Sequence, residues 1–419
     1  MTSRSCQLGR PETLVGGRMG QIKPQESNLG IGLAEPTRLG SYLRRLREGY
    51  GYTLRKVEER ATAIGEAIDN SQLSRFEKGK AIPSFDKLRA LARVFNVPVQ
   101  NFSDVLDLEE YQHLRPETTD QPSLLKAGAE LVERGEYGRA FVTYEKALEL
   151  AETLPVSPES KEMIAEARWR MAIALKKLGK LYMTERELRE ILKHREGLSP
   201  RTRRRALLQL SFLYRELGDL YLATVLARES LQLAKEEGDR SAQAGVLNSM
   251  GNIEFDEGRF DEAEKSYREA MTVLEEMGGY HQMRAMVLTN IGGCLAALGK
   301  FDDGVATLRE AHCRAKEGGF RRVASLSLTR LAEAFRDHGD FSQARDMLAE
   351  SDALASRAED AYHDILFLNA YHRWEMARSE DHGTREKIAF GRLRHLRSLL
   401  QRRFPEVDAF DRHIEKSRR

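Results

Sequence analysis

A glycine recurs at a nearly constant interval in this chain from about residue 124 onward. Each of these glycines is followed two residues later by an aromatic residue or a leucine and five residues later by a small residue, as in Gly258, Phe260 and Ala263. Successive glycines are 44, 39, 40, 41 and 40 residues apart, and a fixed period of this size is the signature of a solenoid. The six glycines are Gly135, Gly179, Gly218, Gly258, Gly299 and Gly339.

Each repeat glycine lies between two apolar patterns of helical spacing. Leu247 and Gly251 belong to the pattern before Gly258, and Ala263 and Tyr267 belong to the pattern after it. We therefore predict a helical hairpin for every repeat, with the glycine in the turn, where it adopts a backbone conformation that other residues resist. Small residues in the first helix would let the two helices approach closely: Gly128, Ala172, Ser211, Gly251, Gly292 and Ala332.

This pattern resembles the tetratricopeptide repeat (TPR) over residues 121–360, with a longer link between repeats than in the usual unit of about 34 residues. A degenerate seventh hairpin is expected at residues 362–403, where many Arg and His residues suit a capping or dimerising end. Residues 404–419 are predicted to be a C-terminal tail with a short helix. The resemblance implies an all-α fold with a right-handed α-solenoid of six to seven helical hairpins, whose first helices line a concave surface.

The groove positions of the repeat family fall on a mixture of aromatic, carboxamide and charged residues. Such a groove suits an extended peptide or a segment of a partner protein, because Asn offers both a donor and an acceptor to a peptide backbone. Repeat proteins of this class commonly place Asn at the positions of Asn248 and Asn252, so repeat geometry alone is an alternative explanation for them. The predicted ligand-binding residues are Trp169, Lys176, Phe212, Arg215, Asn248, Asn252, Phe255 and Arg336, with Ile173, Lys177, Leu208, Thr329 and Glu333 beside them.

A second feature precedes the repeats, in residues 71–79. Leu73 and Phe76 are three residues apart, so one face of a short helix can pack on a core. Gln72, Ser74 and Arg75 point the other way. In a DNA major groove, Gln can pair with adenine and Arg with guanine.

Four further short helices are expected around this one, between residues 37 and 107. Thr53 can cap one of them, and Pro83 and Ser84 can start another. The arrangement resembles the phage-repressor and Cro-like helix-turn-helix family (XRE type). The resemblance implies base contacts from Asn70, Ser71, Gln72, Ser74 and Arg75, and phosphate contacts from Thr53, Arg55 and Lys80.

The turn of this motif departs from the family pattern. The usual turn has about 3–4 residues, whereas residues 61–70 form an insertion between Arg60 and Ser71. Ala61, Ile64 and Ile68 fall at helical spacing, and we expect the preceding helix to continue through them before the chain turns.

Positive charge is concentrated in this helical head. Residues 37–107 contain 13 Lys and Arg against 9 Asp and Glu, a net charge of +4, whereas the whole chain carries +2. This distribution favours phosphate binding. The alternative is a small helical domain with no nucleic-acid role.

The remaining features exclude several classes of protein. No apolar run approaches the roughly 18 residues of a membrane span, and residues 1–36 are predicted to be a disordered leader. Cys6, Cys294 and Cys313 cannot form a disulfide framework, which indicates the reducing cytoplasm, and we expect Cys294 and Cys313 to pack as small apolar residues. No catalytic motif, metal-ligand set or phosphate loop occurs, so we expect neither enzymatic activity nor a cofactor.

A Cro-like head followed by a TPR array looks like the bacterial transcriptional regulators whose repeat domain senses a signal, often a short secreted peptide, and which often work as dimers. The resemblance implies double-stranded DNA and a peptide or protein as partners. The alternatives are a TPR interaction scaffold with a weak or vestigial DNA-binding head and a small-molecule sensor. The expected domains are a leader (1–36), a helix-turn-helix domain (37–107), a linker (108–120), a TPR solenoid (121–403) and a tail (404–419).

Overall fold

The computed structural model describes residues 37–356, 361–400 and 404–417. Within these ranges the chain forms twenty α-helices, one 3-10 helix and no strand, so the expected all-α class is confirmed. The expected disordered leader lies outside the described residues. The chain divides into two compact units, one that ends at Val99 and one that starts at Gln100. The boundary expected from the sequence falls after Asp107.

Four helices form the described part of the first unit: α1 (Arg38–Gly49), α2 (Leu54–Ala63), α3 (Asn70–Glu77) and α4 (Phe85–Phe95). They enclose a small core in which Leu43, Val57, Leu73, Leu91 and Phe95 are fully buried. Side chains cap the helix starts as expected. The hydroxyl of Thr53 accepts from the backbone N–H of Lys56, and that of Ser84 accepts from the N–H of Lys87.

The link between α2 and α3 differs from the sequence prediction. Helix α2 ends at Ala63, and Gly65 adopts a φ of +76° that turns the chain. Ile68 still reaches the core, but it does so from the loop, whereas Ile64 is exposed. The expectation that this helix continues through residue 68 is therefore wrong, because a left-handed glycine ends it.

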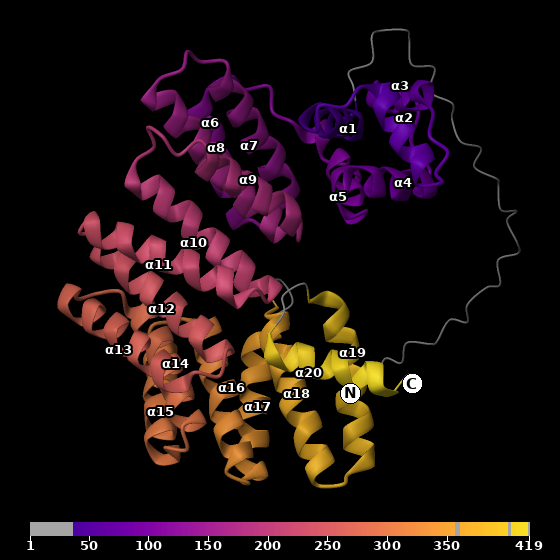
Figure 1. Cartoon of the computed structure of the whole chain (residues 1–419). Coiled ribbons are helices and arrows are strands. Elements are labelled where there is room, and N and C mark those ends of the chain that lie inside the picture. The colour runs from indigo at the N-terminus through magenta and orange to yellow at the C-terminus, as the bar shows by residue number, and fades with distance from the viewer. Residues whose placement is uncertain (1–36, 357–360, 401–403, 418–419) are drawn as a thin grey trace, which may run out of the picture. The chain divides into compact units, whose positions relative to one another are not determined.

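The second unit is built from seven consecutive helical hairpins within its described residues (Figure 1). Helix α5 (Gln100–Glu109) and a 3-10 helix (Gln112–Leu114) precede them, and α20 (Pro405–Ser417) follows. The hairpins are α6 (Gln121–Glu133) with α7 (Tyr137–Glu152), α8 (Pro158–Lys177) with α9 (Leu181–Lys193), α10 (Pro200–Leu217) with α11 (Leu220–Glu236), α12 (Arg240–Asp256) with α13 (Phe260–Met277), α14 (His281–Ala297) with α15 (Phe301–Glu317), α16 (Arg321–Asp337) with α17 (Phe341–Ala355), and α18 (His363–Ser379) with α19 (Gly383–Leu399).

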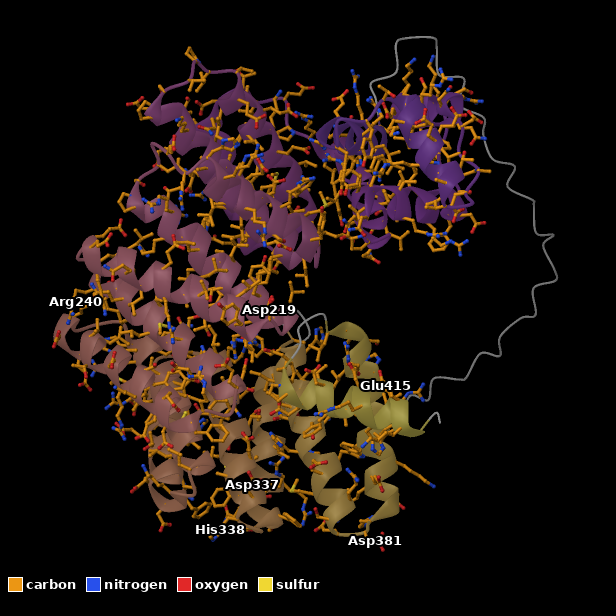
Figure 2. All side chains as sticks on the ribbon, viewed as in Figure 1. Asp219, Arg240, Asp337, His338, Asp381 and Glu415 are labelled. Carbon is orange, nitrogen blue, oxygen red and sulfur yellow. The ribbon has the colours of Figure 1, made fainter. Side chains whose placement is uncertain are left out.

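The repeat glycines occupy the hairpin turns, as predicted. All six have a positive φ, between 74° and 88°, in the left-handed region that L-residues with a side chain rarely adopt. The seventh hairpin has no glycine there. Asp381, labelled in Figure 2, takes its place with a φ of +53°, a conformation that Asp tolerates better than most residues.

Small residues in the first helix of several hairpins accept a large side chain from the second helix. A Cβ atom added at Gly251 would lie 2.6 Å from the ring of Tyr267, and one added at Gly128 would lie 2.3 Å from the ring of Tyr144. At Gly292 the neighbour is Leu308, at 2.7 Å. These contacts are too close for a methyl group, so the small residues set the distance between the paired helices.

Helix α20 closes the far end of the second unit. Its Val407 and Phe410 are fully buried, in one apolar cluster with Phe367 and Trp374. The ring of Phe410 lies 5.9 Å from each of those two rings, edge on, a favoured aromatic geometry. The short helix expected in the last residues is therefore packed as part of the core.

Two further expectations concern the packing of the cysteines and the presence of membrane-spanning helices. Cys294 is buried, as predicted, but Cys313 is exposed and its Sγ lies 3.3 Å from Glu317 Oε1, so its assignment as a packed apolar residue is wrong. None of the described helices is both long enough and apolar enough to cross a membrane.

Candidate nucleic-acid interface and ligand groove

Helix α3 has a buried apolar side and an exposed polar side. Leu73 and Phe76 face the core, whereas Asn70, Ser71 and Arg75 are exposed. Gln72 and Ser74 were expected beside them on the outer face but are half-buried. The side-chain oxygen of Gln72 is shielded from solvent and has no hydrogen-bond partner among the described residues.

Two hydrogen bonds hold the start of α3. The carboxylate of Asp69 accepts from the backbone N–H of Gln72 at 2.7 Å, and this bond lowers the pKa of Asp69. The side-chain amide of Asn70 donates to Glu58 Oε2 at 2.9 Å, which ties the first residue of α3 to α2. Asn70 is thus oriented before any ligand arrives.

The end of α3 is held by an ion pair that sequence reasoning missed. Arg47 of α1 donates to both carboxylate oxygens of Glu77, at 2.7 and 2.9 Å, and to the carbonyl of Tyr52 at 3.0 Å. The two side chains are 14% and 8% exposed. Gly40 brings α1 close enough, because a Cβ there would lie 2.7 Å from the carbonyl oxygens of Phe76 and Glu77.

Exposed cations occur on α2, on α3 and directly after α3. Arg55 and Lys80, expected at phosphates, are exposed, and so are Arg75 and Lys78. Among the described residues, none of these four makes an ion pair. The hydroxyl of Thr53, also expected at a phosphate, caps the start of α2. Unpaired exposed cations are the groups that neutralise phosphates.

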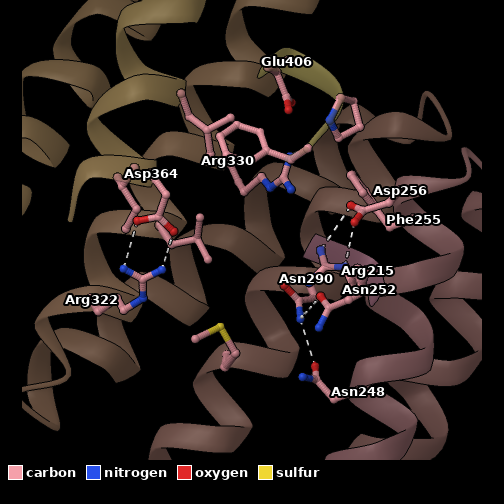
Figure 3. A pocket seen from close by; sticks show the side chains of 16 residues that line it. Arg215, Asn248, Asn252, Phe255, Asp256, Asn290, Arg322, Arg330, Asp364 and Glu406 are labelled. Atoms are coloured by element: carbon pink, nitrogen blue, oxygen red, sulfur yellow. Dashed lines mark hydrogen bonds and ion pairs between the residues drawn. The ribbon is translucent and has the colours of Figure 1, made fainter. Parts of the chain in front are cut away.

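In the second unit, a cavity of about 260 Å³ opens between the first helices of successive hairpins (Figure 3). Helices α10, α12, α14, α16 and α18 all contribute to it. Four of the predicted ligand-binding residues line it, namely Arg215, Asn248, Asn252 and Phe255.

A carboxamide network occupies one side of this cavity. The side-chain amide of Asn290 donates to Asn248 Oδ1 at 2.9 Å, and the hydroxyl of Tyr267 donates to Asn252 Oδ1 at 2.9 Å. Burial raises the pKa of Tyr267 well above its ordinary value, so the hydroxyl keeps its proton. With both oxygens engaged, the side-chain amides of Asn248 and Asn252 remain as donors for a ligand.

Ion pairs occupy the other sides. Arg215 binds Asp256 through two contacts of 2.7 and 3.2 Å. Arg322 binds Asp364 in the same bidentate way, at 3.1 and 2.5 Å. Arginine therefore meets a carboxylate at two places on the cavity wall, and these charges largely cancel.

Arg330 is the third arginine of the wall. It contacts Glu333 at 2.6 Å, and its guanidinium lies 4.7 Å from the ring centroid of Phe255. Burial lowers the pKa of Arg330, but the nearby carboxylates of Glu333 and Glu406 together outweigh it, and the net direction is upward.

The other four predicted groove residues do not line this cavity. The guanidinium of Arg205 lies over the ring of Trp169, 3.6 Å from the centroid of that ring. Lys176 pairs with Glu216 at 3.0 Å and lies 5.7 Å from the ring centroid of Phe212. Arg336 contacts Asp337 and the buried His372 instead.

Several residues of the cavity were missed by sequence reasoning, among them Asn290, Arg330 and Glu406. Asn290 and Arg330 both lie nine residues before the repeat glycine of their own hairpin. The eight predicted groove residues lie ten, six or three residues before their glycines, so the groove positions of the repeat family select neither Asn290 nor Arg330. Glu406 could not be found from the repeat pattern, because it follows the repeats.

Comparison with known proteins agrees with both units. A helix-turn-helix family model matches residues 43–102, and a tetratricopeptide-repeat model matches residues 202–276 and 242–312. Protein KINESIN LIGHT CHAIN-RELATED 1 of Arabidopsis thaliana is 26% identical over 180 residues, which cover 42% of this chain and 29% of that protein. The chain therefore spans less than a third of the curated relative it matches.

Solved structures show the same repeat fold. The apo form of RapI has a TM-score of 0.55 at 12% identity, over 66% of this chain and 97% of that one. A Rap protein complexed with competence and sporulation factor has a TM-score of 0.50 at 17% identity, over 87% of this chain and all of that one.

The matches and the geometry together define the class of protein. It carries a helix-turn-helix domain of the XRE type followed by a solenoid of tetratricopeptide repeats. Both are regulatory or interaction modules.

Proposed function

We propose that this protein is a bacterial transcriptional regulator that works in the cytoplasm. Helix α3 binds operator DNA, and the groove of the repeats binds a peptide or protein signal that alters DNA binding. The exposed polar side of α3 carries the proposal, because Asn70, Ser71 and Arg75 stand outward on a helix held at both ends. An outward polar row on a preorganised helix is suited to reading base edges in the major groove.

The groove supports the sensing part of the proposal. The amides of Asn248 and Asn252 are donors that a peptide carbonyl can accept from, and Phe255 and Met286 add apolar surface beside them. The Rap protein of similar fold is complexed with competence and sporulation factor, a precedent for a bound factor on this architecture. A ligand changes DNA affinity only if it binds two states of the array differently, and we propose that these states differ in the curvature of the solenoid.

We further propose that the working unit is a homodimer. One head makes few base contacts, and two heads on a two-fold site roughly multiply the specificity.

Selection of duplexes from a random pool, followed by fluorescence anisotropy at moderate salt, tests the DNA-binding part. We expect one base order to be preferred over competitor DNA. Arg75→Ala should lower specific affinity by roughly 1–3 kcal/mol, the worth of a good base contact, and relax the preference at one position. Arg89→Ala is the matched control, because Arg89 is also exposed but lies on α4.

A TPR interaction scaffold with a vestigial head is the competing function. If no duplex is preferred over competitor DNA, the scaffold interpretation holds and the regulator is rejected. Mass spectrometry of ligands that copurify with the protein separates a peptide signal from a small molecule.

A further inference from the structure

The C-terminal segment of the chain completes the wall of the groove. Phe404, Pro405 and Glu406 line the same cavity as Asn248 and Asn252, although they follow the last repeat (Figure 3). The next residue, Val407, is fully buried in the end of the solenoid, and so is Phe410 one turn later. Glu406 is therefore held at the cavity by a packed helix, in a fixed position.

Glu406 differs from Asp256 and Asp364, the other acids of the wall, in that it forms no ion pair with a described residue. Asp256 is paired with Arg215 and Asp364 with Arg322. Among the described residues, no side chain forms an ion pair with Glu406. The charge of Arg330 acts on the Glu406 carboxylate, but the ion pair of Arg330 is with Glu333.

The surroundings of Glu406 disfavour its negative charge. Burial raises the pKa of its carboxyl, the Glu333 carboxylate adds to this rise, and Arg330 only partly opposes it. Glu406 lies in the first turn of α20, where the helix dipole stabilises an acid, yet the net direction is still upward. A second cation in the cavity would remove this penalty.

We propose that Glu406 is a specificity-determining residue of the groove and binds a cationic group of the ligand, while Asn248 and Asn252 hold the ligand backbone. The cation is an ammonium or guanidinium, either the free α-amino group of a peptide or the side chain of a Lys or Arg. This inference rests on the proposed function of the groove and goes further, since it assigns a charge to the ligand and a binding role to a segment outside the repeats.

The test uses the full chain and a library of short synthetic peptides with randomised sequence. Peptides retained by the immobilised protein are resynthesised in three forms: the parent, an N-acetylated form, and a form with each Lys or Arg replaced by norleucine. Affinities are measured by fluorescence anisotropy. Acetylation tests the α-amino group, and norleucine tests the side chain.

We expect one of the two neutralised forms to bind the native protein about tenfold more weakly than the parent, as for loss of a charged hydrogen bond. Glu406→Gln should abolish this difference between the forms. Asp408→Asn should keep it, because Asp408 lies in the same helical turn but does not line the cavity. Circular dichroism checks that the variants are folded, and Glu406→Ala replaces Glu406→Gln if the latter is not.

Two results would overturn the inference in different ways. If peptides bind but neither neutralised form is weaker, or if Glu406→Gln keeps the difference, the role of Glu406 is rejected and the peptide-binding groove stands. If the native protein retains no peptide at all, the inference and the peptide-sensing function are both rejected.

Discussion

At the scale of single residues, the head depends on a charged contact between helices that are distant in sequence. Arg47 and Glu77 are thirty residues apart and form two hydrogen bonds in a largely buried site. A bidentate arginine–carboxylate pair fixes both distance and orientation. It therefore positions the end of α3, which also carries the exposed Arg75.

Removal of Glu77 should destabilise the head strongly. We expect Glu77→Ala to lower the free energy of unfolding by roughly 3 kcal/mol, because the half-buried guanidinium of Arg47 is left without its partner. Hydrogen exchange of the backbone amides of α1 and α3 measures this in the full chain. Arg44→Ala is the control, since the ion pair of Arg44 with Glu48 is exposed and its loss should change exchange little. Unchanged exchange in Glu77→Ala would mean that α3 is held in place without this ion pair.

At the scale of elements, the hairpins depend on complementary sizes of residues in paired helices. Gly251 in α12 faces the ring of Tyr267 in α13, and Gly128 in α6 faces Tyr144 in α7. The same tyrosine, Tyr267, also donates to Asn252 in the cavity. Close packing of a hairpin thus also orients a residue of the candidate ligand site.

Two glycines of α12 should respond to the same substitution with opposite sign. Gly251→Ala should be destabilising, because overpacking costs roughly 1–3 kcal/mol and outweighs the higher helix propensity of alanine. Gly245→Ala should be stabilising by up to about 1 kcal/mol, because a Cβ there meets no atom within 4 Å. Thermal midpoints from circular dichroism give the sign of each change. A higher midpoint for Gly251→Ala would show that the hairpin relaxes around the added methyl group.

At the scale of the whole molecule, the chain divides into two compact units, and α20 terminates the second of them. Repeat arrays are stabilised by contacts between neighbours, so an end repeat needs a cap. Phe410 supplies much of that cap by filling the space between Phe367, Trp374 and Phe390.

We expect the effect of removing this cap to be confined to the C-terminal end of the second unit. Phe410→Ala should cost about 3–5 kcal/mol locally and speed hydrogen exchange in α18 and α19, while exchange in α1 to α4 stays unchanged. Ile388→Ala is the matched control, because Ile388 lies on α19 and is 69% exposed. Faster exchange in α1 to α4 of Phe410→Ala would contradict this expectation and show that the two units unfold together.

Local patterns in the sequence were sufficient to predict most of the helices of both units. Helical spacing and the glycine period predict the hairpins, because each repeat is stabilised mainly by its neighbours and by its own turn. The prediction failed between α2 and α3, where Ile64 and Ile68 share a helical spacing that Gly65 interrupts. The roles of Gln72 and of the groove residues in α8 remain predictions.

The sequence by itself determined that the chain folds into a helix-turn-helix head and a helical repeat array, since capping, apolar spacing and turn glycines act over a few residues. Only the tertiary structure decided which side chains share a cavity. Arg47 and Glu77 meet because α1 and α3 pack against each other, and Asn248 and Glu406 line one cavity although they belong to separate helices. No spacing along the chain records these arrangements.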